Sequence, residues 1–127
     1  MFATADPGGY QPVAPGIRRK TLCHGDATLI SEFRLDAGQV LPMHAHPQEQ
    51  TGYLVAGRLR LTIGGRTHDA RPGGSWCIPG GVEHGADVLE DSVAVEVFSP
   101  VREDYLPDGI ERPGADGQRS ADRHAAG

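Results

Sequence analysis

The amino-acid sequence predicts an all-β fold, a sandwich or barrel of short strands joined by tight turns. Glycine and proline account for 18 and 10 of the 127 residues, and this abundance argues against a helical bundle. Between residues 17 and 98 they separate short runs rich in β-branched side chains. The length fits a single domain.

Each expected strand is a short run bounded by turn residues. The run at 58–63 alternates cleanly, with its leucines and its isoleucine on one face, and the Gly64-Gly65 pair that follows is a two-residue hairpin signal. A run at 92–98 alternates in the same way. In chain order, strands are predicted at 18–23, 27–35, 40–46, 50–56, 58–63, 66–70, 75–78, 82–88 and 92–98.

The two ends of the chain lack this pattern. Residues 1–16 and 107–127 are rich in glycine, proline and polar side chains. They are predicted to be an N-terminal arm and a flexible C-terminal tail. The barrel is therefore predicted to span residues 17–106.

Charge and composition restrict the partners and the compartment. A formal charge of −5 argues against a basic surface for nucleic acid, and no apolar run approaches the roughly 18 residues of a membrane span. The first residues do not resemble a signal peptide. Cys23 and Cys77 do not form a disulfide framework, so we expect reduced thiols in a cytoplasmic protein, with Cys77 buried.

The histidines carry the strongest chemical signal. His44 and His46 are two residues apart, and in a strand this spacing puts both imidazoles on one face. Gln50 begins the next expected strand and can reach back toward them. His84 follows a similar phrase framed by glycine and proline. Three imidazoles that converge in this way could bind one metal ion, whereas His24 and His68 lack such framing and are expected to be exposed or structural.

Two segments of the chain resemble the two conserved motifs of the cupin proteins. The residues that match the first motif are Gly38, His44, His46, Gln50 and Gly57. Those that match the second are Gly73, Pro79, Gly81 and His84. The resemblance covers roughly residues 27–98 and implies a cupin-type double-stranded β-helix, or jelly-roll, barrel. It also implies that a divalent transition metal ion (zinc, nickel, iron or manganese) is held inside by His44, His46, Gln50 and His84.

Gln50 stands where the usual cupin motif has glutamate. Its neutral carbonyl oxygen would leave the ion with its full double charge and make it a stronger Lewis acid. Glu49 is the alternative ligand, but strand alternation turns it outward if Gln50 points inward.

Two residues near the last strand have two interpretations each. Glu96 is either a sheltered carboxylate suited to proton transfer or an exposed residue on an edge strand. Arg102 either clamps a substrate carboxylate or is a surface residue paired with Glu103 or Asp104. Phe98 lies on the same face of the strand as Glu96, and this apolar side chain indicates that the face points into the barrel.

Several phrases, including 49–55 and 98–106, resemble the KdgF-type cupins of pectin and alginate catabolism. That resemblance implies a glutamine among the metal ligands and an active site lined by an acid, a phenylalanine and an arginine. These fall on Glu96, Phe98 and Arg102. The acid is often aspartate in that group, so Glu96 is one methylene longer.

Three hypotheses about function follow. The KdgF resemblance implies an enzyme of carbohydrate catabolism that takes a small anionic substrate and converts 4,5-unsaturated uronates to linear 4-deoxy-5-ketouronates. The second hypothesis is an iron-dependent dioxygenase or polyketide-tailoring enzyme, and the third is a non-enzymatic small-molecule-binding protein. A homodimer is also expected, since Tyr53 and Val55 would point outward, where a partner could cover them.

Overall fold

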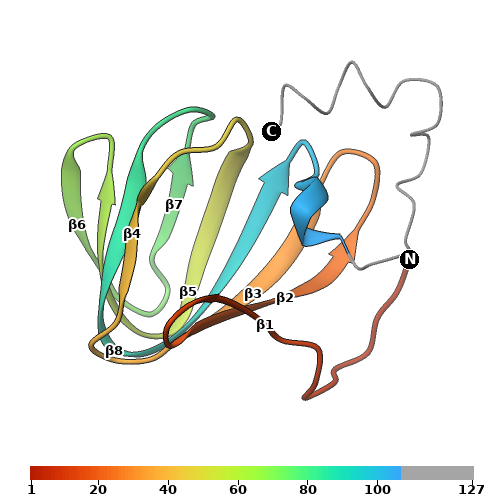
Figure 1. Cartoon of the computed structure of the whole chain (residues 1–127), viewed down its shortest axis with the longest axis horizontal. Helices are drawn as coiled ribbons and strands as arrows, with labels where there is room; N and C mark the ends of the chain where they lie inside the picture. The colour runs from red at the N-terminus through yellow and green to blue at the C-terminus, as the bar shows by residue number, and fades with distance from the viewer. Residues whose placement is uncertain (107–127) are drawn as a thin grey trace.

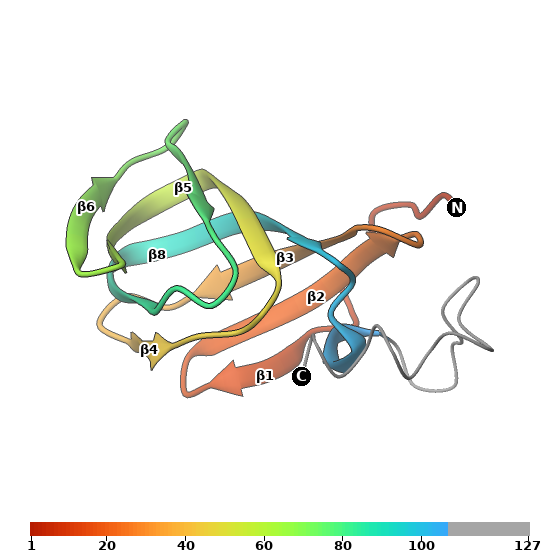
Figure 2. The same cartoon turned by 90° about the horizontal axis from the view of Figure 1, so that it is seen from above.

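The computed structural model describes residues 1–106, which form an all-β barrel as predicted (Figures 1 and 2). The expected tail at 107–127 lies outside the described residues. A short 3-10 helix, η1 (Glu103–Tyr105), follows the last strand. The strands are β1 (Gln11–Ala14), β2 (Ile17–His24), β3 (Leu29–Leu35), β4 (Val40–His44), β5 (Glu49–Ile63), β6 (Arg66–Ala70), β7 (Ser75–Ile78) and β8 (His84–Ser99).

The barrel has two halves because β5 and β8 are long and bend, and each pairs with different neighbours along its length. β7 pairs with residues 50–53 of β5, and β6 pairs with residues 59–63. On β8, residues 84–87 pair with β4 and residues 92–98 pair with β3. The two long strands also pair with each other (Figure 2), so they link both halves of the barrel around one interior.

The sequence predicted two strands in each of 50–63 and 82–98, where the structure has one. Gly57 lies at the bend of β5 with φ 94°, and the pairing with β8 shifts register on both sides of it. A Cβ at this position would approach the backbone of Asp91 closer than 3.0 Å. The break in the alternation is therefore a bulged bend and not a loop.

The expected N-terminal arm also contributes a strand. β1 runs antiparallel to β2, with Pro12 opposite Arg18, and it lies at the end of the strand order. Proline is tolerated at such an edge because no further strand needs its missing N–H. The sequence did not predict this strand, because the arm is rich in glycine and proline and shows no alternating pattern.

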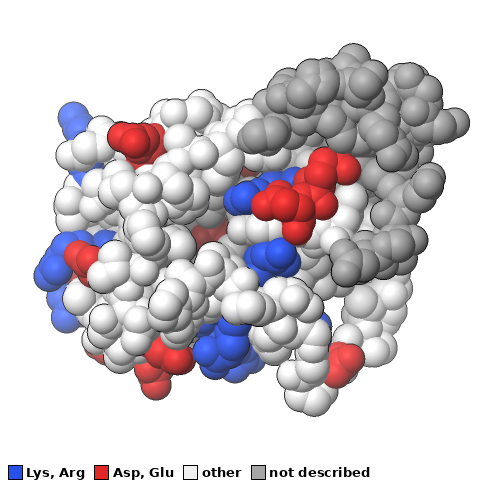
Figure 3. Space-filling model, in the orientation of Figure 1, with Lys and Arg blue, Asp and Glu red and all other residues white. Residues whose placement is uncertain are grey.

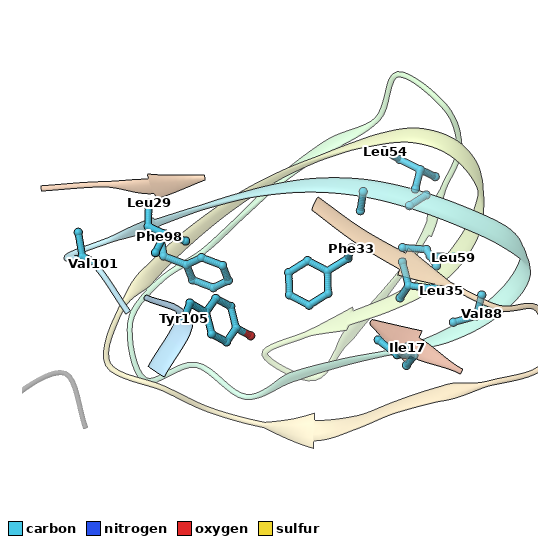
Figure 4. Packing of buried hydrophobic residues seen from close by; sticks show 12 residues of the cluster. Ile17, Leu29, Phe33, Leu35, Leu54, Leu59, Val88, Phe98, Val101 and Tyr105 are labelled. Carbon is cyan, nitrogen blue, oxygen red and sulfur yellow. The ribbon is translucent and has the colours of Figure 1, made fainter. Parts of the chain in front are cut away.

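Apolar side chains fill the interior, as the alternation predicted (Figure 4). Leu59 and Leu61 on β5 are buried, and Ile63 at its end is half-buried. Cys77 was expected to be buried but is exposed, because it points outward between Trp76 and Ile78 on β7. The buried cluster comprises Ile17, Leu29, Phe33, Leu35, Leu54, Leu59, Ala70, Val88, Ala94, Phe98, Val101 and Tyr105.

The visible surface carries charges of both signs. Acidic and basic side chains are interspersed on the face seen in Figure 3, where the described residues form no extended basic patch. Within residues 1–106, no helix is long and apolar enough to cross a membrane.

Candidate metal and active site

Three histidines meet at one end of the barrel interior. His44 ends β4 and pairs in register with His84, the first residue of β8, while His46 lies in the loop before β5. The ring centroid of His84 lies 4.2 Å from that of His44 and 4.9 Å from that of His46. One ring nitrogen from each of the three lies within 4.8 Å of the other two. The structure thus brings together the histidines that the sequence singled out.

The hydrogen bonds of the three rings show which nitrogen of each ring lies against the backbone. Each Nδ1 lies beside a backbone carbonyl two residues away in sequence, at 2.9 Å for His44, 3.1 Å for His46 and 2.9 Å for His84. A carbonyl only accepts, so each Nδ1 carries the hydrogen and each Nε2 keeps its lone pair. The Nε2 of His84 is buried with no hydrogen-bond partner. Such a set of lone pairs fits a metal ion.

Burial keeps the imidazoles of His46 and His84 in the neutral form that binds metal. Burial lowers the pKa of His84 to about 4. It also lowers the pKa of His46, and the nearby charge of Arg102 acts in the same direction. Neutral imidazoles are the ligand form, so a metal ion would displace few protons from these two residues.

Gln50 lies between the histidines and a buried acid. Its Oε1 is 3.0 Å from the Nε2 of His46, and its side chain also hydrogen-bonds Glu96. An ionised carboxylate needs a donor, so the amide N–H faces Glu96 and the carbonyl oxygen faces His46. Two ligand atoms about 2.1 Å from one ion and at right angles to each other are about 3.0 Å apart. The contact between Gln50 and His46 therefore fits a shared ion.

Glu96 points into the barrel and is 8% exposed. It lies in the middle of β8, between β3 and β5, so the edge-strand interpretation is wrong. The indole N–H of Trp76 donates to Glu96 Oε1 at 3.1 Å. Burial raises the pKa of Glu96 to about 7, although the bonds from Gln50 and Trp76 act in the opposite direction. Such a carboxyl can both accept and release a proton near neutral pH.

Phe98 and Arg102 form the wall next to this carboxyl. Phe98 is 1% exposed, and its ring meets that of His46 edge-on at 5.7 Å. The Arg102 guanidinium stacks on Phe98 and on Tyr105, with centroid distances of 5.2 and 4.1 Å. Arg102 also pairs with Asp104, whose Oδ2 lies 2.8 Å from its Nη2. Arg102 therefore both lines the interior cavity and forms an ion pair with Asp104, and its binding of a substrate carboxylate stays a prediction.

One small cavity connects these groups. It has a volume of about 50 Å³, and its lining includes His44, His84, Glu96 and Arg102. That volume holds only a few water molecules, so a larger ligand would have to widen the cavity. A larger hollow of about 920 Å³ lies against β2 and β3 under the N-terminal residues, but it contains none of these groups. The chemistry of the site therefore belongs to the small interior cavity.

The remaining candidates lie elsewhere. Glu49 is exposed, as the strand alternation predicted, and His68 is exposed. His24 is half-buried, and neither of its ring nitrogens has a hydrogen-bond partner. Trp76 was a candidate pocket residue whose orientation the sequence could not predict, because only the pairing of β7 with β5 places it near Glu96.

Comparisons with known proteins agree with this fold. The family model described as a cupin domain matches residues 31–100. The pectin degradation protein KdgF of Dickeya dadantii is 27% identical over 103 residues, which cover 80% of this chain and 94% of that protein. The structure of KdgF from Halomonas sp. has a TM-score of 0.78 and 33% identity, covering 84% of this chain and 98% of that one. An RmlC-like cupin from Shewanella frigidimarina has a TM-score of 0.78 and 26% identity, covering 83% and 95%.

Proposed function

Since the chain belongs to the cupin family and is homologous to KdgF, we propose that it is a metal-dependent enzyme that converts 4,5-unsaturated uronates to linear 4-deoxy-5-ketouronates. One observation carries this proposal. A single cavity is lined by two of the three clustered histidines, the buried carboxyl of Glu96 and the guanidinium of Arg102. An acid–base group, an anion-binding group and a metal-binding cluster within one cavity suit an anionic substrate whose protons must move.

The metal-binding part of the proposal concerns four side chains. His44, His46 and His84 offer neutral nitrogens, and Gln50 offers a neutral oxygen. A divalent ion (zinc, nickel, iron or manganese) bound there would supply Lewis-acid chemistry toward a substrate oxygen. Because all four ligands are neutral, none of them would reduce the charge of the ion.

The protein side chains divide the remaining tasks. Arg102 binds the carboxylate of the uronate through its guanidinium. Phe98 forms an apolar wall that keeps water from the reacting bonds. Glu96 removes and delivers protons, because its environment favours neither protonation state strongly near neutral pH.

The proposed reaction is an isomerisation in which every atom is retained. The C1 hydroxyl loses its proton as the bond between C1 and the ring oxygen breaks, and C1 becomes an aldehyde. The released ring oxygen takes up a proton and remains on C5 as an enol. The enol then loses that proton while C4 gains one, which yields the 5-keto group. Glu96 carries these protons, and neither an oxidant nor a water molecule is consumed.

The direct test is turnover of an unsaturated monouronate by protein loaded with each candidate metal. We expect loss of the ultraviolet absorbance of the conjugated C4=C5 bond, with the linear product identified by NMR. Saturated galacturonate and metal salt without protein serve as controls. No acceleration with zinc, nickel, iron or manganese would refute the proposal. Oxygen consumption by the iron-loaded protein would instead favour the dioxygenase hypothesis, and ligand binding without turnover would favour a binding protein.

Asp104 is expected to compete with the substrate for Arg102. Its carboxylate bonds the guanidinium that we assign to the substrate carboxylate, and it is 59% exposed. An exposed ion pair is worth up to about 1 kcal/mol, so Asp104→Asn is expected to lower KM up to about fivefold. Glu103→Gln is the control for the lost charge. A raised KM in Asp104→Asn would mean that Asp104 holds Arg102 in place.

We also propose a homodimer formed through the outer face of β5. Tyr53 and Val55 are each 49% exposed there, and burying them against a second copy would remove apolar surface from water. Light scattering is expected to give the mass of two chains, and Val55→Asp is expected to give one. A wild-type mass of one chain would contradict the homodimer.

A further inference from the structure

A row of three residues crosses the inner wall of the barrel beside the histidine cluster. Trp76 on β7 pairs in register with Gly52 on β5, and Gly52 pairs with Glu96 on β8. Residues paired across antiparallel strands point to the same face of the sheet. The middle residue of this row has no side chain, so the side chains on either side can meet above it. They do so through the 3.1 Å hydrogen bond from Trp76 Nε1 to Glu96 Oε1.

Gly52 is required for space and not for backbone conformation. It is not among the residues with positive φ, so alanine there would cause no backbone strain. A Cβ at position 52 would nevertheless lie closer than 3.0 Å to both Trp76 Nε1 and Glu96 Oε1. The space left by the missing side chain is thus the space through which the indole reaches the carboxylate.

We propose that Trp76, reaching over Gly52, is a positioning residue that orients the Glu96 carboxylate toward the substrate. This inference rests on the proposed function, in which Glu96 moves protons. Trp76 and Gln50 both donate to this carboxylate, and both donors are neutral. Neutral donors orient a carboxylate but weaken its basicity less than an arginine or lysine would. The two donors therefore fix the orientation of the Glu96 carboxylate.

The first test needs no substrate. Trp76 is the only tryptophan of the chain, so the full-length 15N-labelled protein gives one indole N–H resonance. We expect Glu96→Gln to shift this resonance, because a neutral acceptor replaces a charged one. We expect Gly52→Ala to shift it too and to speed its exchange with water by about fivefold, as the loss of one hydrogen bond predicts. Glu90→Gln, an exposed position on the same strand, is the control and should leave the resonance unchanged.

The second test is kinetic. Trp76→Phe keeps an aromatic ring but removes the donor, so kcat is expected to fall by about 10- to 100-fold, the usual cost of a misplaced catalytic group. KM is expected to change less than about threefold and the metal content to stay the same, because the hydrogen bond that is removed goes to Glu96 and not to Arg102 or a histidine. Tyr10→Phe is the matched control. It removes an aromatic donor to a different glutamate, Glu32, outside the cavity.

The outcomes separate this inference from the proposed function. An indole resonance that is the same in wild type and Glu96→Gln would overturn the inference, and so would a wild-type kcat in Trp76→Phe. If the wild type turns over no unsaturated uronate, the proposed function fails. In that case, the shift of the indole N–H resonance in Glu96→Gln alone decides whether Trp76 holds the carboxylate.

Discussion

Replacing His44 and His46 together with alanine is expected to abolish metal binding. The double variant removes two of the three clustered imidazoles and leaves His84 and Gln50, which are too few ligands for a stable site. Elemental analysis of untagged protein should find near-stoichiometric divalent metal in the wild type and little in the variant. The identity of that metal would then guide the choice of substrates to test.

Thermal unfolding provides a second measure of the same change. A ligand that binds only the folded state stabilises it, so added metal should raise the Tm of the wild type and not that of the double variant. His68→Ala, which removes an exposed imidazole on β6, is the control and should behave like the wild type. A wild-type protein that holds no metal even after reconstitution would contradict the proposed site and favour the non-enzymatic hypothesis.

Glu96→Gln is expected to lower kcat by about 10²- to 10⁴-fold, the usual contribution of a general acid or base. Glutamine has nearly the same shape and can still accept the bond from Trp76, so the metal content should not change. The measurement is steady-state kinetics on the unsaturated uronate, with Glu90→Gln as the exposed control. Wild-type kcat in Glu96→Gln would remove Glu96 from the mechanism.

The same substitution is expected to stabilise the metal-free protein at high pH. The folded-state pKa of Glu96 is raised to about 7 from an ordinary value of 4.5. Below pH 4.5 the carboxyl is uncharged in the folded and the unfolded protein, so its burial is tolerated. As pH rises from 4.5 through about 7, the free energy of unfolding falls, because the buried group must then ionise. Glutamine does not ionise, so Glu96→Gln should raise the Tm at pH 8 and change it little at pH 4. Equal effects at both pH values would contradict this account.

The glutamine at position 50 has a reason that becomes visible only in three dimensions. Its amide faces His46 on one side and Glu96 on the other. Glutamate there would put two carboxylates in contact, and like charges at that distance disfavour ionisation of both. An amide instead offers an oxygen to the metal cluster and an N–H to the acid. The sequence indicated that Gln50 faces inward, but not that Glu96 is its neighbour.

The sequence alone determined the features that depend on spacing along one strand or turn. The two-residue interval kept His44 and His46 close, although β4 ends at His44 and His46 lies in the loop that follows, and alternation at 58–63 predicted the buried face of β5. The same parity turned Glu49 outward. These features are local because side chains alternate with a period of two, so each follows from its immediate neighbours.

The tertiary structure decided everything that depends on the register between distant strands. Whether Glu96 is buried depends on β3 and β5 flanking β8, and Trp76 reaches it only because Gly52 lies between them. The bend at Gly57 and the pairing of β1 with β2 likewise depend on partners outside the local pattern. Alternation shows which residues share a face, but only strand pairing decides which strands lie beside that face and what their side chains contact.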